Sequence, residues 1–365
     1  MDSNIKAAIV FGAAIAVGVS VLAVVFASLD EEMPMRGPQE VDAPVPARPD
    51  NPAPGLVGIA HYINTTPEAL AEEIDGSVVM YDIWTYSCIN CVRTLPYITS
   101  WHEKYADDGL LIIGVHSPEF EFEKDLANVE RAVQKHGITY PVVMDNDMDT
   151  WKAFENRYWP RKYIADHEGN IRYDHIGEGD YENTERVIQA LLSERADALG
   201  MAEMPETGTV DIAEYENEGR TRELYFGYAF AYGRNQLGAP EGFAPGQDVS
   251  YAEPGPLRND HFYPVGTWTN LEGSMRLVSD SGRVLLPYHA KQVNIVAGSA
   301  APASLEVLLD GEPIGPADAG SDVSGGVAEV GEHGLYNIVS SEESGRRTLE
   351  LRASGGFEIF TFTFG

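Results

Sequence analysis

The chain has 365 residues, more than one ordinary domain needs, and a net charge of −32 from 57 acidic and 25 basic residues. Such an acidic chain would be repelled by the phosphates of nucleic acids and anionic lipids, so neither is an expected partner. Because 44% of its residues are hydrophobic, the chain can bury a sizeable core, which excludes a wholly disordered protein. We therefore expect a folded protein with two domains.

Residues 7–29 form an apolar run without a single charge. At about 1.5 Å per residue this run can cross a hydrocarbon core of about 30 Å. A cleaved signal peptide usually has an apolar core of about 7–15 residues, so an uncleaved anchor is favoured, although cleavage after Ala27 stays open. Because Lys6 precedes the run, the N-terminus is expected in the cytoplasm and the soluble part in the periplasm or at the cell surface. The sequence thus predicts an anchor or signal segment at 1–29 and a proline-rich linker at 30–55.

Residues 56–200 alternate apolar runs typical of buried strands with segments of helical periodicity. The expected strands are 77–84, 109–117 and 140–144, followed by a hairpin at 161–177. The expected helices are 90–105, 121–136, 146–158 and 183–199. Strands that alternate with helices predict parallel pairs and the late hairpin predicts antiparallel ones, so we expect a mixed α/β sheet flanked by helices.

Residues 205–365 lose the helical periodicity and become rich in glycine, proline and short alternating runs. Asp310 and Gly311 between two such runs indicate a hairpin, and the whole pattern predicts an all-β sandwich. The aromatic residues Trp268, Tyr263 and Tyr288 could stack on a sugar, although aromatic side chains in a sandwich more often belong to the core.

Cys88 and Cys91 are the only cysteines, and they lie where a strand is expected to lead into a helix. A thiol at a helix N-terminus is readily ionised, and a second thiol one turn later can resolve the mixed disulfide that the first one forms. A zinc or copper site is less favoured because two thiolates supply only half of a usual zinc ligand set. A structural disulfide is less favoured because so small a loop restrains little of the unfolded chain.

The residues around this pair resemble the thioredoxin superfamily. "WTYSCINC" (84–91), "GVHSPEF" (114–120) and "YWPRKYIAD" (158–166) carry the resemblance. It is closest to TlpA- and ResA-like redoxins, and among these to the thioredoxin module and C-terminal domain of DipZ-type proteins. The resemblance implies a thioredoxin-like fold at 56–200 and a β-sandwich at 205–365 that is similar to carbohydrate-binding modules.

The same resemblance implies roles for individual residues. Cys88 would attack the disulfide of a protein substrate, and Cys91 would resolve the product. Asp82, six residues before Cys88 in a buried strand, would take up and return the proton of Cys91, with a raised pKa if it is buried. Substrate contacts would come from two pairs of neighbouring residues: Trp159 and Pro160, which match the family's cis-proline loop, and Trp84 and Tyr86.

Activity and partners follow from these roles as expectations. The chain is expected to be a thiol-disulfide oxidoreductase that acts on protein thiols and disulfides with no cofactor beyond the Cys88–Cys91 pair. Since the multi-helix membrane domain of DipZ-type proteins is not found in this sequence, a separate membrane electron-transfer protein of the CcdA/DsbD type is expected as its donor. A thiol peroxidase is the first alternative, because Thr85 lies three residues before Cys88, although Tyr81 replaces the proline that peroxidases carry. A copper-binding or carbohydrate-binding module is the second.

Overall fold

The structure is a computed structural model that describes residues 51–201, 208–216 and 218–365. All of them belong to one compact unit, Val45–Gly365. The apolar run at 7–29 and most of the expected linker lie outside the described residues. Within the described residues, no helix is both long and apolar enough to span a bilayer.

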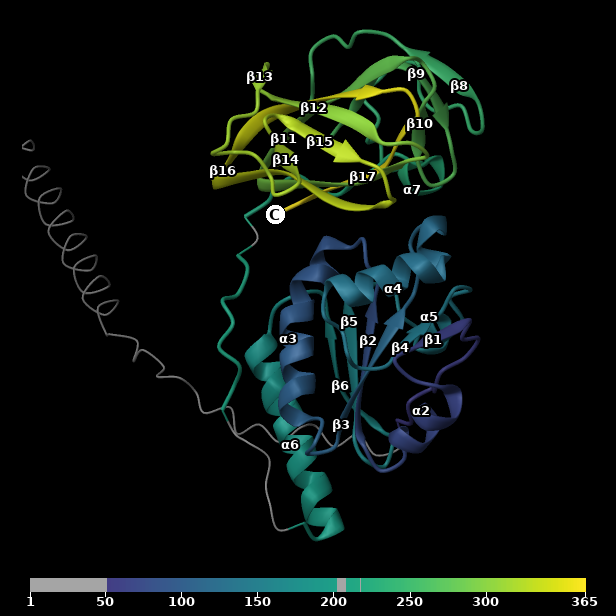
Figure 1. The fold of residues 1–365 in the computed structure, drawn as a ribbon, viewed down its shortest axis with the longest axis vertical. Helices are drawn as coiled ribbons and strands as arrows, with labels where there is room; N and C mark the ends of the chain where they lie inside the picture. Colours follow the sequence, from purple (N-terminus) through teal and green to yellow (C-terminus); the bar gives the residue numbers. More distant parts are fainter. Residues whose placement is uncertain (1–50, 202–207, 217) are drawn as a thin grey trace, which may run out of the picture. The chain divides into compact units, whose positions relative to one another are not determined.

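The first half of the described chain builds a mixed sheet of six strands in the order β1-β4-β3-β2-β5-β6 (Figure 1). Its strands are β1 (His61–Ile63), β2 (Val78–Trp84), β3 (Leu110–His116), β4 (Val142–Met144), β5 (Arg161–Ala165) and β6 (Ile171–Ile176). β2, β3 and β4 are parallel, whereas β1, β5 and β6 pair antiparallel with their neighbours. The mixed sheet that the sequence predicts is therefore present, and β1 is a strand that the sequence did not reveal.

Helices cover both faces of this sheet. They are α2 (Pro67–Ile74), α3 (Ile89–Tyr105), the short 3-10 helix η1 (Glu121–Lys124), α4 (Leu126–Lys135), α5 (Asp149–Ala153) and α6 (Tyr181–Leu199). Because alternate residues of a strand point to opposite faces, β2 sends Met80 to the core under α3, α4 and α6, and Tyr81 to the core under α2 and α5. β2 is buried along its whole length as a result.

Two helices differ from the sequence-based expectation. The predicted helix at 121–136 is divided, because the Asp125 side chain accepts hydrogen bonds from the backbone N–H groups of Ala127 and Asn128 and so starts α4 afresh. The predicted helix at 146–158 is reduced to the five residues of α5. Its start is fixed by the buried Asp145 carboxylate, which accepts hydrogen bonds from the backbone N–H groups of Thr150 and Trp151.

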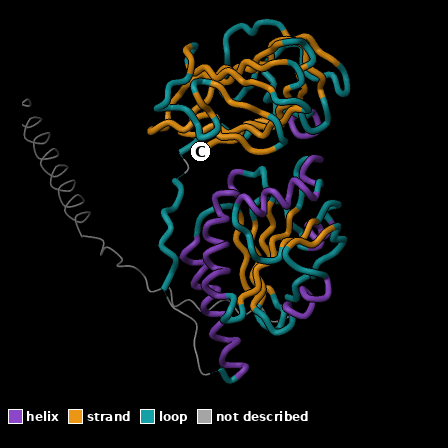
Figure 2. Tube along the Cα trace, viewed as in Figure 1, coloured by secondary structure: helices purple, strands orange, loops and turns teal. Residues whose placement is uncertain are grey.

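The second half of the described chain is dominated by strands (Figure 2). One sheet holds eleven of them: β7 (Leu224–Tyr225), β8 (Asp248–Tyr251), β9 (Tyr263–Asn270), β10 (Met275–Leu277), β11 (Ser281–Ser299), β12 (Ala303–Leu309), β13 (Glu312–Pro313), β14 (Val323–Ser324), β15 (Val327–Val330), β16 (Gly334–Ser354) and β17 (Phe357–Phe364). The hairpin predicted at Asp310 and Gly311 joins β12 to β13. The strand β16 runs through 21 residues.

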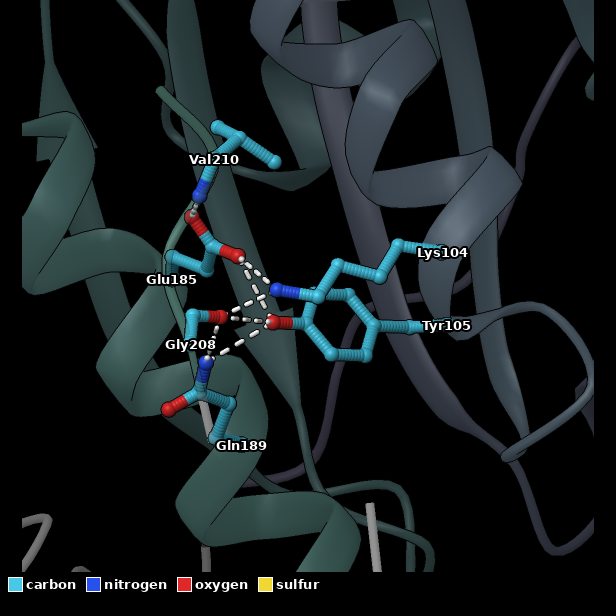
Figure 3. A network of polar contacts seen from close by, with 6 residues as sticks. All are labelled: Lys104, Tyr105, Glu185, Gln189, Gly208 and Val210. Atoms are coloured by element: carbon cyan, nitrogen blue, oxygen red, sulfur yellow. Dashed lines mark hydrogen bonds and ion pairs between the residues drawn. The ribbon is translucent and has the colours of Figure 1, made fainter. Parts of the chain in front are cut away.

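The segment between the two halves is fastened to the first half by a polar network (Figure 3). The buried Glu185 carboxylate of α6 accepts hydrogen bonds from the Tyr105 hydroxyl at 2.6 Å and from the Val210 N–H at 2.8 Å. The Lys104 ammonium and the Gln189 amide both reach the carbonyl oxygen of Gly208. These contacts hold residues 208–210 against α3 and α6, so the chain leaves the six-stranded half at a defined place.

Aromatic side chains join the two halves within the compact unit. The rings of Phe120, in the loop before η1, and Phe360, in β17, lie 5.1 Å apart and are both buried. The Tyr86 hydroxyl donates to the His333 carbonyl oxygen at 3.4 Å. Residues of both halves therefore lie near the start of α3, where the two cysteines lie.

Candidate active site

Cys88 and Cys91 lie where the buried strand β2 gives way to α3. Cys88 is the N-cap residue of this 17-residue helix, and its Sγ atom accepts a hydrogen bond from the Cys91 N–H at 3.3 Å. Unpaired N–H groups and the helix dipole favour negative charge at such an end. The fold thus offers the Cys88 sulfur the donors that stabilise a thiolate.

The two thiols differ in their access to solvent. Cys88 is half-buried, whereas Cys91 has an exposed fraction of 0%. Burial, and then the neighbouring Cys88 sulfur, raise the pKa of the Cys91 thiol well above its ordinary value. Only Cys88 is accessible to a substrate, and Cys91 needs a base before it can react.

Asp82 and Lys162 form a buried pair of opposite charge beneath the cysteines. They are direct neighbours across the antiparallel pairing of β2 with β5, and their exposed fractions are 0% and 1%. Within the described residues, the two carboxylate oxygens of Asp82 have no hydrogen-bond partner. The Nζ atom of Lys162 has none either. Two buried polar groups without hydrogen bonds are costly to the fold, which points to a chemical role rather than a stabilising one.

The electrostatics of this pair suit proton transfer. Burial raises the pKa of Asp82 to about 6, although the Lys162 ammonium holds it back. Burial also lowers the pKa of Lys162, against the attraction of Asp82 and of Cys91. A carboxyl group with a pKa of about 6 exchanges its proton readily near neutral pH. Sequence analysis missed Lys162; its signal was a lysine within a strand that is otherwise buried.

Trp159 and Pro160 directly precede β5. The peptide bond between them is cis. The Trp159 Nε1–H donates to the Ser117 carbonyl oxygen at 3.0 Å, and its ring centroid lies 4.2 Å from that of Trp151. These contacts fix the Trp159 indole so that it and Cys88 line the same pocket.

Comparison with protein families accounts for both halves. Residues 51–192 match the family described as Redoxin, and residues 221–365 match the family described as thioredoxin-like C-terminal domain. Residues 51–192 are therefore a redoxin-like domain. This redoxin domain carries the cysteine pair, Asp82, Lys162 and the Trp159–Pro160 loop.

Several known proteins are similar to this chain. Protein DipZ of Mycobacterium bovis is 34% identical over 316 residues, which is 86% of this chain and 43% of DipZ. The chain therefore spans less than half the length of this relative. The thiol-disulfide oxidoreductase YkuV of Bacillus subtilis is 29% identical over 39% of this chain and 95% of its own length. A thioredoxin-like protein solved in its oxidised form is 29% identical over 40% of this chain and 96% of its own, with a TM-score of 0.36.

A buried carboxylate fixes the loop that leads to Cys88 in the redoxin domain. Glu123 of η1 has an exposed fraction of 0% and accepts a hydrogen bond from the Ser87 hydroxyl at 2.6 Å. Its second oxygen accepts from the backbone N–H groups of Glu119 and Phe120 at 2.6 and 2.9 Å. Burial raises the pKa of Glu123, which these hydrogen bonds oppose. Sequence analysis missed this residue because alternating acidic and phenylalanine residues at 119–123 resemble an exposed helix.

A buried imidazole supports the same loop from the other side. The His116 Nε2 atom lies 3.3 Å from the Thr85 Oγ1 atom and 3.4 Å from the Tyr86 nitrogen. Burial lowers the pKa of His116 to about 3, so its ring is neutral at physiological pH. The Thr85 hydroxyl is engaged with this ring rather than with an incoming peroxide, which weighs against the peroxidase alternative.

Trp84 and Tyr86 do not present the exposed surface that a substrate contact needs. Trp84 has an exposed fraction of 0% and packs edge-on against His116 inside the core. Tyr86 is 8% exposed, and its hydroxyl donates a hydrogen bond to the His333 carbonyl oxygen. The substrate contact expected of Trp84 does not fit this burial, because the final residue of a strand buried on both faces points inward.

The metal and the carbohydrate considered as alternative ligands are each tested by the positions of the side chains that would bind them. Among the described residues there is no group of three or more histidine, cysteine or acidic side chains placed to hold a metal ion. Trp268, Tyr263 and Tyr288 have exposed fractions of 0%, 3% and 1%. Trp268 and Tyr288 belong to the core of the eleven-stranded half and Tyr263 is likewise buried, so the sugar-stacking role considered for them does not fit their positions.

Proposed function

We propose that this protein is a thiol-disulfide oxidoreductase in which Cys88 attacks and Cys91 resolves. The observation that carries the proposal is the asymmetry of the pair: a half-buried Cys88 at a helix N-terminus above a buried Cys91 whose neighbours include Asp82 and Lys162. The similarity to YkuV, which is named as a thiol-disulfide oxidoreductase, supports it.

The reaction then proceeds in two exchanges. The Cys88 thiolate bonds to one sulfur of the substrate disulfide, and the other substrate sulfur leaves as a thiolate that takes up a proton. Asp82, next to the Lys162 ammonium, accepts the proton of Cys91. The Cys91 thiolate attacks the Cys88 sulfur, which releases the second substrate thiol and leaves a Cys88–Cys91 disulfide. The Trp159–Pro160 loop positions the substrate chain against Cys88.

The location and the partners are further parts of this proposal. The apolar run at 7–29 supports a membrane-anchored protein with its folded part outside the cytoplasm. Protein thiols and disulfides are the proposed substrates. The resemblance to DipZ supports a membrane protein of the CcdA/DsbD type as the electron donor. We further propose domain limits of 56–200 and 205–365, with the eleven-stranded half arranged as a β-sandwich.

Turnover of a protein disulfide tests the activity. With dithiothreitol as reductant, the chain should accelerate the reduction of insulin, and Cys88→Ser should abolish the acceleration. Asp107→Asn, which changes an exposed acidic residue, serves as the control and should match the parent. Insulin reduction by Cys88→Ser at the parental rate would contradict the proposal. The potential of the pair then decides the direction: about −270 mV favours a reductant and about −120 mV an oxidant.

A further inference from the structure

Cys88 opens into a small pocket that both halves of the compact unit build. The redoxin domain contributes Cys88, Glu119 and Trp159, and the C-terminal half contributes Glu223 and Tyr225 among others. A substrate sulfur that approaches Cys88 through this pocket passes these side chains. The C-terminal half therefore takes part in deciding which disulfides react.

The size of the pocket limits what enters it. Its volume is about 210 Å³, below the roughly 300–1,000 Å³ of sites that hold drug-sized molecules. The pocket can admit a small disulfide, or one cysteine side chain on an extended segment with its nearest neighbours.

The polar wall of the pocket is acidic. The Tyr225 hydroxyl lies 2.8 Å from a carboxylate oxygen of Glu119 and 2.8 Å from one of Glu223. A phenol has one proton to donate, so it cannot satisfy both carboxylates at once. Desolvation and the neighbouring carboxylates of Glu223 and Glu123 raise the pKa of Glu119, and the Tyr225 hydrogen bond and the Arg234 guanidinium oppose this rise only in part. A cationic group in the pocket would favour the ionised form of both carboxylates and would donate hydrogen bonds to them.

Positive charge is scarce around this wall. None of the described residues that line the pocket is basic. The guanidinium of Arg234 lies 4.6 Å from the centre of the Tyr225 ring and attracts the carboxylates of Glu119 and Glu223, but Arg234 is exposed to solvent and is not part of the lining. The chain's charge of −32 adds a long-range attraction for cations that salt can screen.

We propose that this pocket selects disulfides that carry a positively charged group close to the reacting sulfur, which the Glu119–Tyr225–Glu223 wall binds while Cys88 attacks. This inference rests on the proposed thiol-disulfide exchange and specifies its substrate class. Each turnover releases the two halves of the disulfide one after the other: Cys88 displaces the first half as a thiolate, and Cys91 displaces the second half from Cys88. Both thiolates take up a proton and leave as thiols. The two electrons come from the Cys88–Cys91 thiols.

Three small disulfides of different charge test the selection. Reduced protein is mixed at neutral pH with an excess of cystamine (cationic), bis(2-hydroxyethyl) disulfide (neutral) or dithiodiglycolate (anionic), and the loss of thiols is followed. Each rate constant is divided by that for dithiothreitol with the same disulfide, which removes the intrinsic reactivity of the disulfide. After this correction, cystamine should react about tenfold faster than the neutral disulfide, and dithiodiglycolate should be slowest.

Two variants distinguish the effect of the pocket's carboxylates on the reaction rates from the effect of the chain's overall charge. Glu223→Gln should lower the ratio of cystamine to dithiodiglycolate rates about fivefold. Glu312→Gln, an exposed position outside the pocket, should keep the parental ratio. Equal corrected rates for the three disulfides in the parent would overturn the proposed selection, as would a cystamine preference that Glu223→Gln retains in full. Because the parental ratios are measured first, the test stands even where a variant folds poorly. A reduced protein that reacts with none of the three would instead refute thiol-disulfide exchange itself.

Discussion

Replacing Asp82 with asparagine removes a charge that the fold holds in a fully buried position. Burial raises the pKa of Asp82 from 3.8 to about 6. Below pH 3.8 the carboxyl is protonated in both the folded and the unfolded chain, so it has no effect on the pH dependence of stability. Between these two pH values the unfolded chain releases the proton and the folded chain keeps it, so stability falls as pH rises. Above about pH 6 the loss levels off at about 3 kcal/mol.

The Asp82→Asn variant carries no such penalty. At about pH 8 it should therefore be more stable than the parent by up to about 3 kcal/mol, and the gain should vanish near pH 3.5. The gain is reduced by the attraction that Asp82 gives to the buried Lys162 ammonium. Urea unfolding at a series of pH values measures the difference, with Asp107→Asn as the exposed control.

The same variant should lose activity while it gains stability. Without the Asp82 carboxylate, the Cys91 thiol loses its proton acceptor, so insulin reduction should slow about tenfold or more near neutral pH. The deficit should shrink toward about pH 9, where the thiol ionises without help. An Asp82→Asn protein that is less stable than the parent at pH 8, or that follows the parental activity at every pH, would refute the role given to this carboxylate.

Three further predictions follow from the surroundings of the cysteines. Iodoacetamide at about pH 6 should label the half-buried Cys88 before Cys91, and mass spectrometry showing Cys91 labelled first would reverse their roles. Lys162→Met keeps the apolar stem but removes the ammonium that holds back the pKa of Asp82, so the pH midpoint of insulin reduction should move upward; a downward or absent shift would contradict the coupling of the pair. Glu123→Gln loses charge-assisted hydrogen bonds to the loop before Cys88 and should cost about 1–3 kcal/mol in urea unfolding, and an unchanged stability would show that this carboxylate does not hold the loop.

Local pattern was sufficient to predict the main strands and helices of the six-stranded half and one hairpin of the eleven-stranded half. The run at 77–84 is β2, the helical spacing from Asn90 to Tyr105 lies in α3, and Asp310-Gly311 joins two strands. These elements follow from the periodicity of apolar residues and from turn chemistry, both of which a single sequence displays. The short strand β1 could not be found this way, since it is stabilised by pairing with β4 rather than by its own three residues.

The parts of the site that depend on contacts between distant segments could not be predicted. Lys162 faces Asp82 only because β5 pairs antiparallel with β2 in one particular register. Glu123 reaches Ser87 across 36 residues of sequence, and Tyr225 reaches Glu119 across 106. Such partners are set by tertiary packing, for which the sequence pattern carries no local signal.

Trapping of a mixed disulfide tests the central claim most directly. Cys91→Ser and Cys88→Ser are each reduced, mixed with a slight excess of bis(2-hydroxyethyl) disulfide, quenched with acid and analysed by intact mass. The account predicts that Cys91→Ser rapidly accumulates an adduct on Cys88, whereas Cys88→Ser remains almost unmodified because its remaining thiol is buried. Equal adduct formation by the two variants would contradict the assignment of Cys88 as the attacking thiol.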